Sequence, residues 1–164
     1  YAAGDVTGAP WLETVAAREG AIAVASAFDA KPLSINYDAI PAAVFIDPQV
    51  AIAGITEEEL MRRIGKCSCR TVPLSFVPKA DITNQTNGVA KMVIHPDTKK
   101  IVGFHLVGPN AAEVIHEAAL AIQHGLTIHD IINLVHVFPS YSEVIKITAQ
   151  AFTRDIQNMS CCVE

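Results

Sequence analysis

A series of short apolar segments, rich in Val, Ile and Ala, constrains the fold of this chain more than any other feature. Turn-forming residues separate these segments, and His95-Pro96-Asp97 between the last two is typical of a hairpin turn. Because strands joined by short turns pair antiparallel, we expect an antiparallel sheet. The segments predict strands over residues 43–46, 50–55, 66–77, 89–95 and 101–107.

Helical patterns accompany and follow these strands. Thr56 with Glu59, and Ser140 with Glu143, have the spacing of capping boxes, and Gly125 is placed to end a helix. Sequential strands followed by helices predict an α+β fold, in which the helices pack on one face of the sheet. The predicted helices cover residues 10–28, 56–64, 110–124, 128–134 and 140–158.

The N-terminal segment differs from the rest. Residues 1–6 are predicted to form a short strand that leads through a Gly-containing turn into the first helix, and the Pro-containing residues 31–36 resemble a linker. We therefore expect two units, residues 1–36 and residues 37–164. Because the chain starts at Tyr1 inside a predicted strand, we expect it to be part of a longer protein.

Composition excludes several function classes. A chain of 164 residues fits one ordinary domain, or one domain with a fragment of another. With 51% hydrophobic and 18% charged residues, we expect another chain or domain to cover part of its surface. A net charge of −5 without a basic cluster argues against binding to nucleic acid or to a membrane. Neither a membrane-spanning run nor a signal peptide is evident, so we expect a cytoplasmic protein.

Two adjacent thiols, Cys161 and Cys162, stand near the C-terminus. A disulfide between neighbours would be strained, because consecutive Cα atoms lie only about 3.8 Å apart. Thiolates favour soft metal ions, and a terminal segment can carry such an ion between sites. The pair therefore indicates soft-metal binding, and the alternative is that two small apolar side chains pack the last turn onto the core.

A second pair, Cys67 and Cys69, falls on a predicted strand. Residues two apart on a strand share a face, with Cα atoms about 6.6 Å apart, a separation that is marginal for a disulfide. Packing in the core or at the sheet edge is the favoured interpretation. The alternative interpretation is a second soft-metal site.

The order of certain segments resembles the FAD-dependent pyridine nucleotide-disulfide oxidoreductases. These segments are Gly4-Asp5, residues 45–51, residues 103–108 and residues 137–143. The resemblance covers essentially the whole chain and implies the end of a flavin-binding domain followed by the domain through which two subunits form a homodimer. It implies that Asp5, in the turn with Gly4, hydrogen-bonds the ribityl chain of FAD.

Other parts of that family's pattern are absent from the sequence. The Gly-x-Gly-x-x-Gly fingerprint is missing, and so is the redox-active cysteine pair beside the flavin. The complete enzyme implied by the resemblance uses FAD and NADPH. We expect the chain alone to bind neither tightly and to be inactive.

Within the family, a Met-Ser-Cys-Cys ending resembles the branch that reduces Hg(II) to Hg(0). This resemblance implies that Cys161 and Cys162 are the metal ligands and act in catalysis. In disulfide-reducing relatives, such as dihydrolipoamide dehydrogenase, a His acts as acid and base at the position of Phe138, and a Glu matching Glu143 orients it. Phe138 and Glu143 are therefore the other two candidates for catalytic positions.

Phe cannot transfer a proton, which disfavours a disulfide substrate. His136 is a possible substitute, although a polar residue in a helix connection is the simpler interpretation. Two alternatives stay open. One is the C-terminal domain of a dihydrolipoamide dehydrogenase-like disulfide reductase, and the other is a non-enzymatic metal-binding or dimerisation module.

Overall fold

The computed structural model describes residues 1–28 and 33–158. Within these residues the strands form a five-stranded antiparallel sheet in the order β1-β2-β5-β4-β3. Each of the five strands predicted between residues 43 and 107 is found, but the first lies two residues earlier than expected and the third is shorter. It ends at Pro73 because a 3-10 turn, Leu74–Phe76, and an unpredicted helix, α3 (Pro78–Ile82), follow. The strands are β1 (Pro41–Val44), β2 (Gln49–Gly54), β3 (Ser68–Pro73), β4 (Val89–Ile94) and β5 (Ile101–Gly108).

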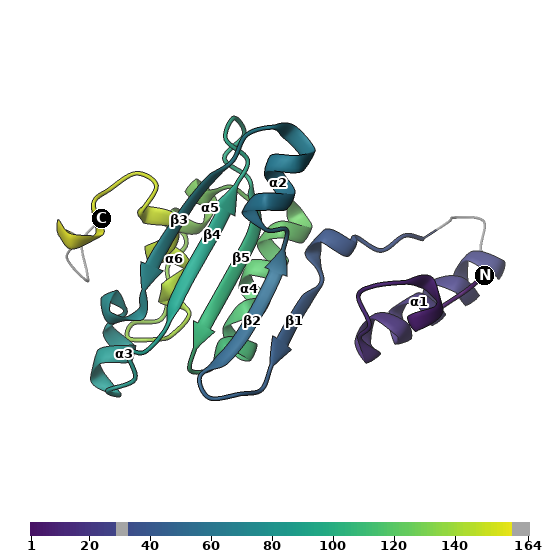
Figure 1. Cartoon of the computed structure of the whole chain (residues 1–164), viewed down its shortest axis with the longest axis horizontal. Coiled ribbons are helices and arrows are strands. Elements are labelled where there is room, and N and C mark those ends of the chain that lie inside the picture. The colour runs from purple at the N-terminus through teal and green to yellow at the C-terminus, as the bar shows by residue number, and fades with distance from the viewer. Residues whose placement is uncertain (29–32, 159–164) are drawn as a thin grey trace.

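Three helices lie on one face of this sheet, as Figure 1 shows: α4 (Ala111–His124), α5 (Ile128–Asn133) and α6 (Glu143–Gln150). Alternate strand residues point toward them, and Met92, Phe104 and Leu106 are almost completely buried there. Apolar side chains of α4 and α6, including Ile115 and Ile145, complete the core. The predicted α+β fold is therefore confirmed.

The last helix is much shorter than the predicted range of 140–158. Helix α6 ends at Gln150, and turns and a short 3-10 helix, Ile156–Asn158, follow. Side-chain hydrogen bonds from outside the helix are found at this end. The Thr153 hydroxyl donates to the Gln150 carbonyl at 3.1 Å, and the Arg70 guanidinium on β3 donates to the Ala151 carbonyl at 3.0 Å. The Gln150 carbonyl also accepts hydrogen bonds from the backbone N–H groups of Thr153 and Arg154, both at 2.9 Å.

Helix α2 (Glu57–Ile64) differs from the others, because it rests on one end of the opposite face of the sheet (Figure 1). Its predicted boundaries are confirmed. The Thr56 side chain accepts a hydrogen bond from the Glu59 backbone N–H at 3.1 Å, and Gly65 ends the helix in the left-handed conformation. The helix therefore begins next to β4, where Glu57 meets Lys91.

The N-terminal segment contradicts one prediction. The strand expected over residues 1–6 is not formed, and Asp5–Thr7 is instead a 3-10 turn. A strand needs a neighbour to satisfy its backbone hydrogen bonds. None of the described strands lies beside this segment, since α1 (Glu13–Phe28) and its preceding turn stand to one side of the sheet (Figure 1).

No helix in residues 1–28 or 33–158 combines the length and the apolar character needed to cross a membrane.

Candidate functional site

The Gly4-Asp5 turn is held by a buried glutamate of α1. Glu19 is 6% exposed, and its carboxylate accepts hydrogen bonds from the Gly4 backbone N–H at 2.6 Å and from the Thr7 hydroxyl at 3.1 Å. The Tyr37 hydroxyl donates to the same carboxylate at 2.6 Å. These bonds, with that from Tyr37 the largest cause, hold the pKa of Glu19 below its usual value. Glu19 thus links the turn to the start of the sheet domain, and the sequence analysis missed it.

Two features of the turn suit a cofactor contact. Gly4 has φ 82°, a conformation that strains residues with a side chain. The Asp5 carboxylate is exposed and makes no hydrogen bond within the described residues. It is therefore available to accept a hydrogen bond from a hydroxyl group, which is the contact expected for the ribityl chain of FAD.

Phe138 lies on the connection between α5 and α6, here called the 134–142 loop. Its side chain is 48% exposed, while Val135 and Val137 are 90% and 78% exposed. Neighbouring large apolar side chains that face solvent mark a surface for another chain or domain. The loop therefore presents Phe138 within an apolar surface.

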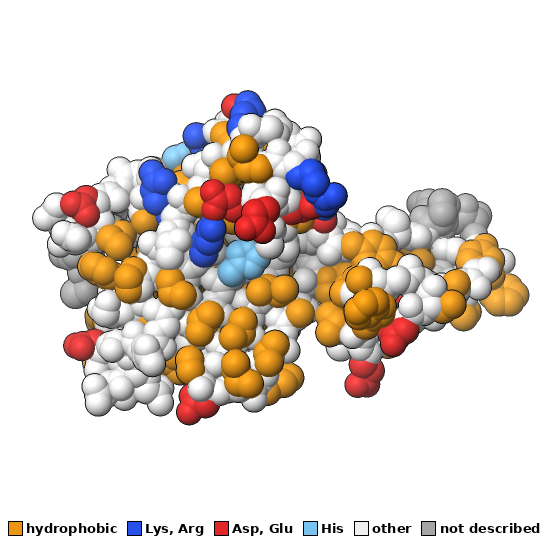
Figure 2. Space-filling model, in the orientation of Figure 1, with side chains coloured by type: hydrophobic (Ala, Val, Ile, Leu, Met, Phe, Trp, Pro, Cys, Tyr) orange, Lys and Arg blue, Asp and Glu red, His pale blue; other side chains and the backbone are white. Residues whose placement is uncertain are grey.

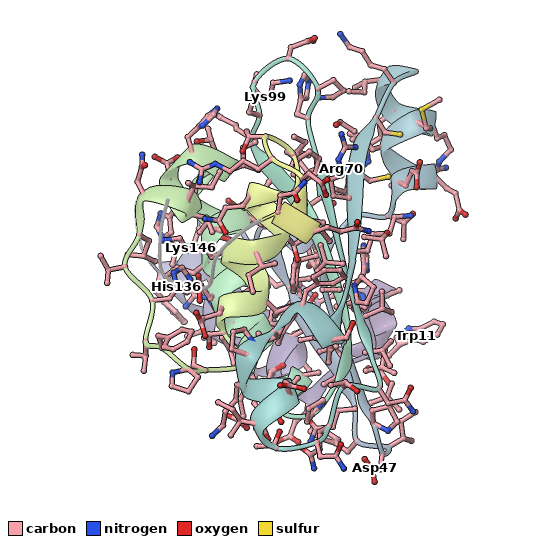
Figure 3. The ribbon with its side chains drawn as sticks, turned by 90° about the vertical axis from the view of Figure 1, so that its left-hand side faces the viewer. Trp11, Asp47, Arg70, Lys99, His136 and Lys146 are labelled. Atoms are coloured by element: carbon pink, nitrogen blue, oxygen red, sulfur yellow. The ribbon has the colours of Figure 1, made fainter. Side chains whose placement is uncertain are left out.

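A buried histidine anchors this loop. His136 is held between Glu117 on α4, whose carboxylate lies 2.8 Å from Nε2, and the Leu134 carbonyl, 3.2 Å from Nδ1. Because both ring nitrogens face acceptors, the protonated imidazole can donate a hydrogen bond to each of them. Glu117 accordingly raises the pKa of His136. The Lys146 ammonium, near His136 in Figure 3, also donates to the Leu134 carbonyl, at 3.1 Å.

Glu143 caps the start of α6. Its carboxylate accepts a hydrogen bond from the Ser140 backbone N–H at 3.0 Å, so half of the expected capping box is present. The other half of that prediction, a cap formed by the Ser140 hydroxyl, is wrong. Ser142 occupies the N-cap position, and the buried Ser140 hydroxyl has no hydrogen-bond partner among the described residues. Tyr141 secures the end of the loop, because its hydroxyl donates to Gln85 at 2.9 Å.

The structure therefore groups the predicted site residues in pairs. Phe138 and Glu143 share the 134–142 loop, and Gly4 and Asp5 share the turn before α1. Figure 1 shows these two regions at opposite edges of the sheet. Cys161 and Cys162 lie outside the described residues. In residues 1–28 and 33–158, no group of three or more His, Cys, Asp or Glu side chains is arranged to hold a metal ion.

Comparison with known proteins agrees with this architecture. The family described as pyridine nucleotide-disulphide oxidoreductase, dimerisation domain, matches residues 40–149. A mercuric reductase of Staphylococcus aureus is 36% identical over 162 residues, which cover 99% of this chain and 30% of that protein. The mitochondrial dihydrolipoyl dehydrogenase of Pisum sativum is 35% identical over 156 residues, or 92% of this chain and 30% of that protein.

A solved structure shows the same fold. The crystal structure of LpdA from Mycobacterium tuberculosis superposes with a TM-score of 0.82 at 30% identity, covering 94% of this chain and 34% of that one. The chain spans about a third of the length of these relatives. Its sheet, its helices and its sequence all match the same domain, and the chain therefore belongs to the pyridine nucleotide-disulphide oxidoreductase family, as its dimerisation domain.

Proposed function

We propose that this chain is the C-terminal part of a mercury(II) reductase. In this proposal residues 1–36 end a flavin-binding domain, and residues 37–164 form the dimerisation domain with a Cys-Cys tail. The complete cytoplasmic enzyme reduces Hg(II) to Hg(0) with NADPH through FAD. One combination of features carries the proposal. The chain has two adjacent thiols, Cys161 and Cys162, and it has Phe138, which cannot act as an acid or base, in the 134–142 loop.

The contacts of the 134–142 loop support a metal ion over a disulfide as the substrate. Disulfide reduction needs an acid to protonate the departing thiolate. Phe138 cannot supply a proton, and Glu143 Oε2 accepts a hydrogen bond from the Ser140 backbone N–H at the start of α6. His136 is buried and bonded through both nitrogens, so it holds the loop rather than facing a substrate. Transfer of a metal ion between thiolates needs no such acid.

The tail supplies the complementary chemistry. Thiolate exchange moves a soft ion from one sulfur pair to another without releasing it to water. In the proposed mechanism Cys161 and Cys162 capture Hg(II) and pass it to the flavin-side cysteines of the other subunit. Both tail thiols lose their protons when the ion binds.

The N-terminal turn has a supporting role. When bound, FAD supplies the electron relay between nicotinamide and metal. Asp5 would accept a hydrogen bond from a ribityl hydroxyl, and Gly4 keeps the turn in its left-handed conformation. Because the nicotinamide site lies outside this chain in the proposal, the isolated chain should not oxidise NADPH when Hg(II) is added.

The proposal includes a homodimer. The exposed apolar side chains of the 134–142 loop, together with Leu120 on α4, which is 58% exposed, offer a surface that a second copy can cover. Sedimentation of the chain should give about twice 17.5 kDa. A monomer at micromolar concentration would show that pairing needs other parts of the protein.

The decisive test uses a full-length protein that contains this chain. We expect Hg(II) to drive its NADPH oxidation in the presence of competing thiols, and Cys161→Ala/Cys162→Ala to abolish most of that activity. A dihydrolipoamide dehydrogenase-like function is the second candidate, because the Pisum sativum relative is 35% identical. Efficient turnover of lipoamide, unaffected by the double substitution, would favour that candidate and reject ours.

A further inference from the structure

Four side chains form a cluster beneath α2, on the face of the sheet opposite α4 and α6. Cys67 directly precedes β3, Cys69 lies within it, and Glu57 begins α2. The Cys67 thiol donates a hydrogen bond to Glu57 Oε1 at 3.4 Å. Cys69, two residues further along, shares the same face of the strand. Lys91 on β4 places its ammonium 2.6 Å from Glu57 Oε2. The Glu57 carboxylate therefore lies beside the thiol pair, hydrogen-bonded to Cys67 and paired with Lys91.

The spacing of the thiols suits a bridging ion better than a direct bond. Alternate strand residues have Cα atoms about 6.6 Å apart, whereas disulfides prefer about 5.5–6 Å. Two metal–sulfur bonds in line, each about 2.3 Å long, would separate the sulfur atoms by about 4.6 Å. Small rotations of the two side chains about their Cα–Cβ bonds can reach that separation without moving the strand.

We propose that Cys67 and Cys69 form a second metal site, which takes one divalent thiophilic ion such as Hg(II) as a two-coordinate dithiolate. Two ligands suffice for such an ion, whereas Zn(II) in a structural site requires four. This distinction matters because the described residues provide no cluster of three or more metal-binding side chains. A pair of thiolates therefore suits ions that accept linear coordination by two sulfur atoms.

Charge balance favours a divalent ion. Binding replaces two thiol protons with one M²⁺ ion, and both protons leave to solvent. The net charge of the cluster is unchanged, since Glu57 and Lys91 keep their ion pair. A monovalent ion would instead leave one negative charge without a partner in a half-buried position, which costs free energy.

The thiols are accessible from solvent. Both are partly exposed, and β3 lies at the edge of the sheet, so an ion can approach from solvent. Figure 2 shows charged side chains gathered on this half of the face and apolar side chains below them.

The test is independent of the proposed tail site, because it uses the 164-residue chain with Cys161→Ser/Cys162→Ser. Only Cys67 and Cys69 then remain. Hg(II) is added with excess glutathione, and the folded complex is examined by native mass spectrometry and by X-ray absorption at the mercury edge. We expect one Hg(II) per chain, bound by two sulfur atoms, without attached glutathione.

Single substitutions sharpen the result. Cys67→Ser or Cys69→Ser should weaken binding by at least about 100-fold, because the second thiolate acts at a high effective concentration. The remaining thiol should then carry mercury as a mixed adduct with glutathione. Ser68→Ala is the matched control, because Ser68 lies between the two cysteines but on the other face of the strand. It should bind Hg(II) as strongly as the Cys161→Ser/Cys162→Ser chain does.

Three outcomes would overturn the proposal, and none requires a substitution at the site itself. A glutathione–mercury adduct on the chain with both thiols would show that they do not act together. One ion per two chains would show bridging between copies. A mass lower by two hydrogens and no bound metal would show that the thiols form a disulfide instead. Circular dichroism of each variant confirms that the fold is intact.

Discussion

The two faces of the sheet differ in what covers them. Phe104 and Met92 point toward α4 and α6, and neither is exposed to solvent. On the other face Val44 and Ile52 remain 55% and 43% exposed, and α2 covers only the end that carries Cys69. The comparison separates two roles. The helix-covered face supplies the stability of the domain, and the other face keeps reactive groups and apolar area available to an ion or to another chain.

Phe104→Ala tests the helix-covered face, and we expect it to lower stability more than the other substitutions. The ring is 0% exposed in the middle of β5, and its removal leaves a cavity between the sheet and α4. We expect the free energy of unfolding to fall by about 3–5 kcal/mol. Urea denaturation followed by circular dichroism measures this change. A loss below about 1 kcal/mol would mean that the covered face is not the main source of stability.

His136→Gln should have the next largest effect, and the effect should depend on pH. Removing the hydrogen-bonded cation from Glu117 is expected to cost about 1.5–3 kcal/mol. The folded pKa of His136 is raised above the unfolded value of 6.5. The contribution of the pair is therefore fully present below pH 6.5 and is lost as pH rises through the folded pKa.

Unfolding measured between pH 5.5 and about 9 should show the unsubstituted chain and His136→Gln converging at high pH. His116→Gln, which removes an exposed histidine one residue before Glu117, is the matched control and should leave the pH dependence unchanged. The Lys146 ammonium opposes the protonation of His136, so it limits the rise in that pKa. A constant gap between the two chains at all pH values would contradict a charged His136.

Thr56→Ala should affect only the sparsely covered face. The substitution removes the side-chain cap of α2 and should cost about 1 kcal/mol. Because α2 rests on only one end of the sheet (Figure 1), we expect faster amide exchange in α2 while α4 keeps its protection. Thr86→Ala, an exposed threonine in a loop, serves as the control. Equal loss of protection in α4 would show that both faces unfold as one unit.

Ile52→Ala should have the smallest effect. The side chain is partly exposed at the centre of the open face, so its loss should cost about 0.5–1 kcal/mol. Stability measured at several protein concentrations checks this expectation. A larger loss, growing with protein concentration, would show that a second copy covers this face, and it would remove the contrast between the two faces.

Local patterns were sufficient to predict most of the fold. Each strand of the sheet was expected at a range that overlaps the observed one, although the third was expected to be longer. Short apolar segments and the intervening turns act over a few residues. The start of α2 after Thr56 and the end of α4 at Gly125 followed from capping chemistry, which is equally local. The strand expected over residues 1–6 was wrong, since pairing depends on a neighbour that a local pattern does not reveal.

Contacts between distant residues were decided only by the tertiary structure. The sequence indicated the thiols at 67 and 69, but not that Glu57 and Lys91 would meet them, or that Glu117 would hold His136 from 19 residues away. Gln49 similarly caps α4 by accepting a hydrogen bond from the Ala112 N–H, 63 residues later. The sequence by itself therefore determined which residues have reactive side chains and where most of the helices and strands lie. Packing decided which side chains act together, because a hydrogen bond reaches only about 3 Å and the fold alone brings remote atoms that close.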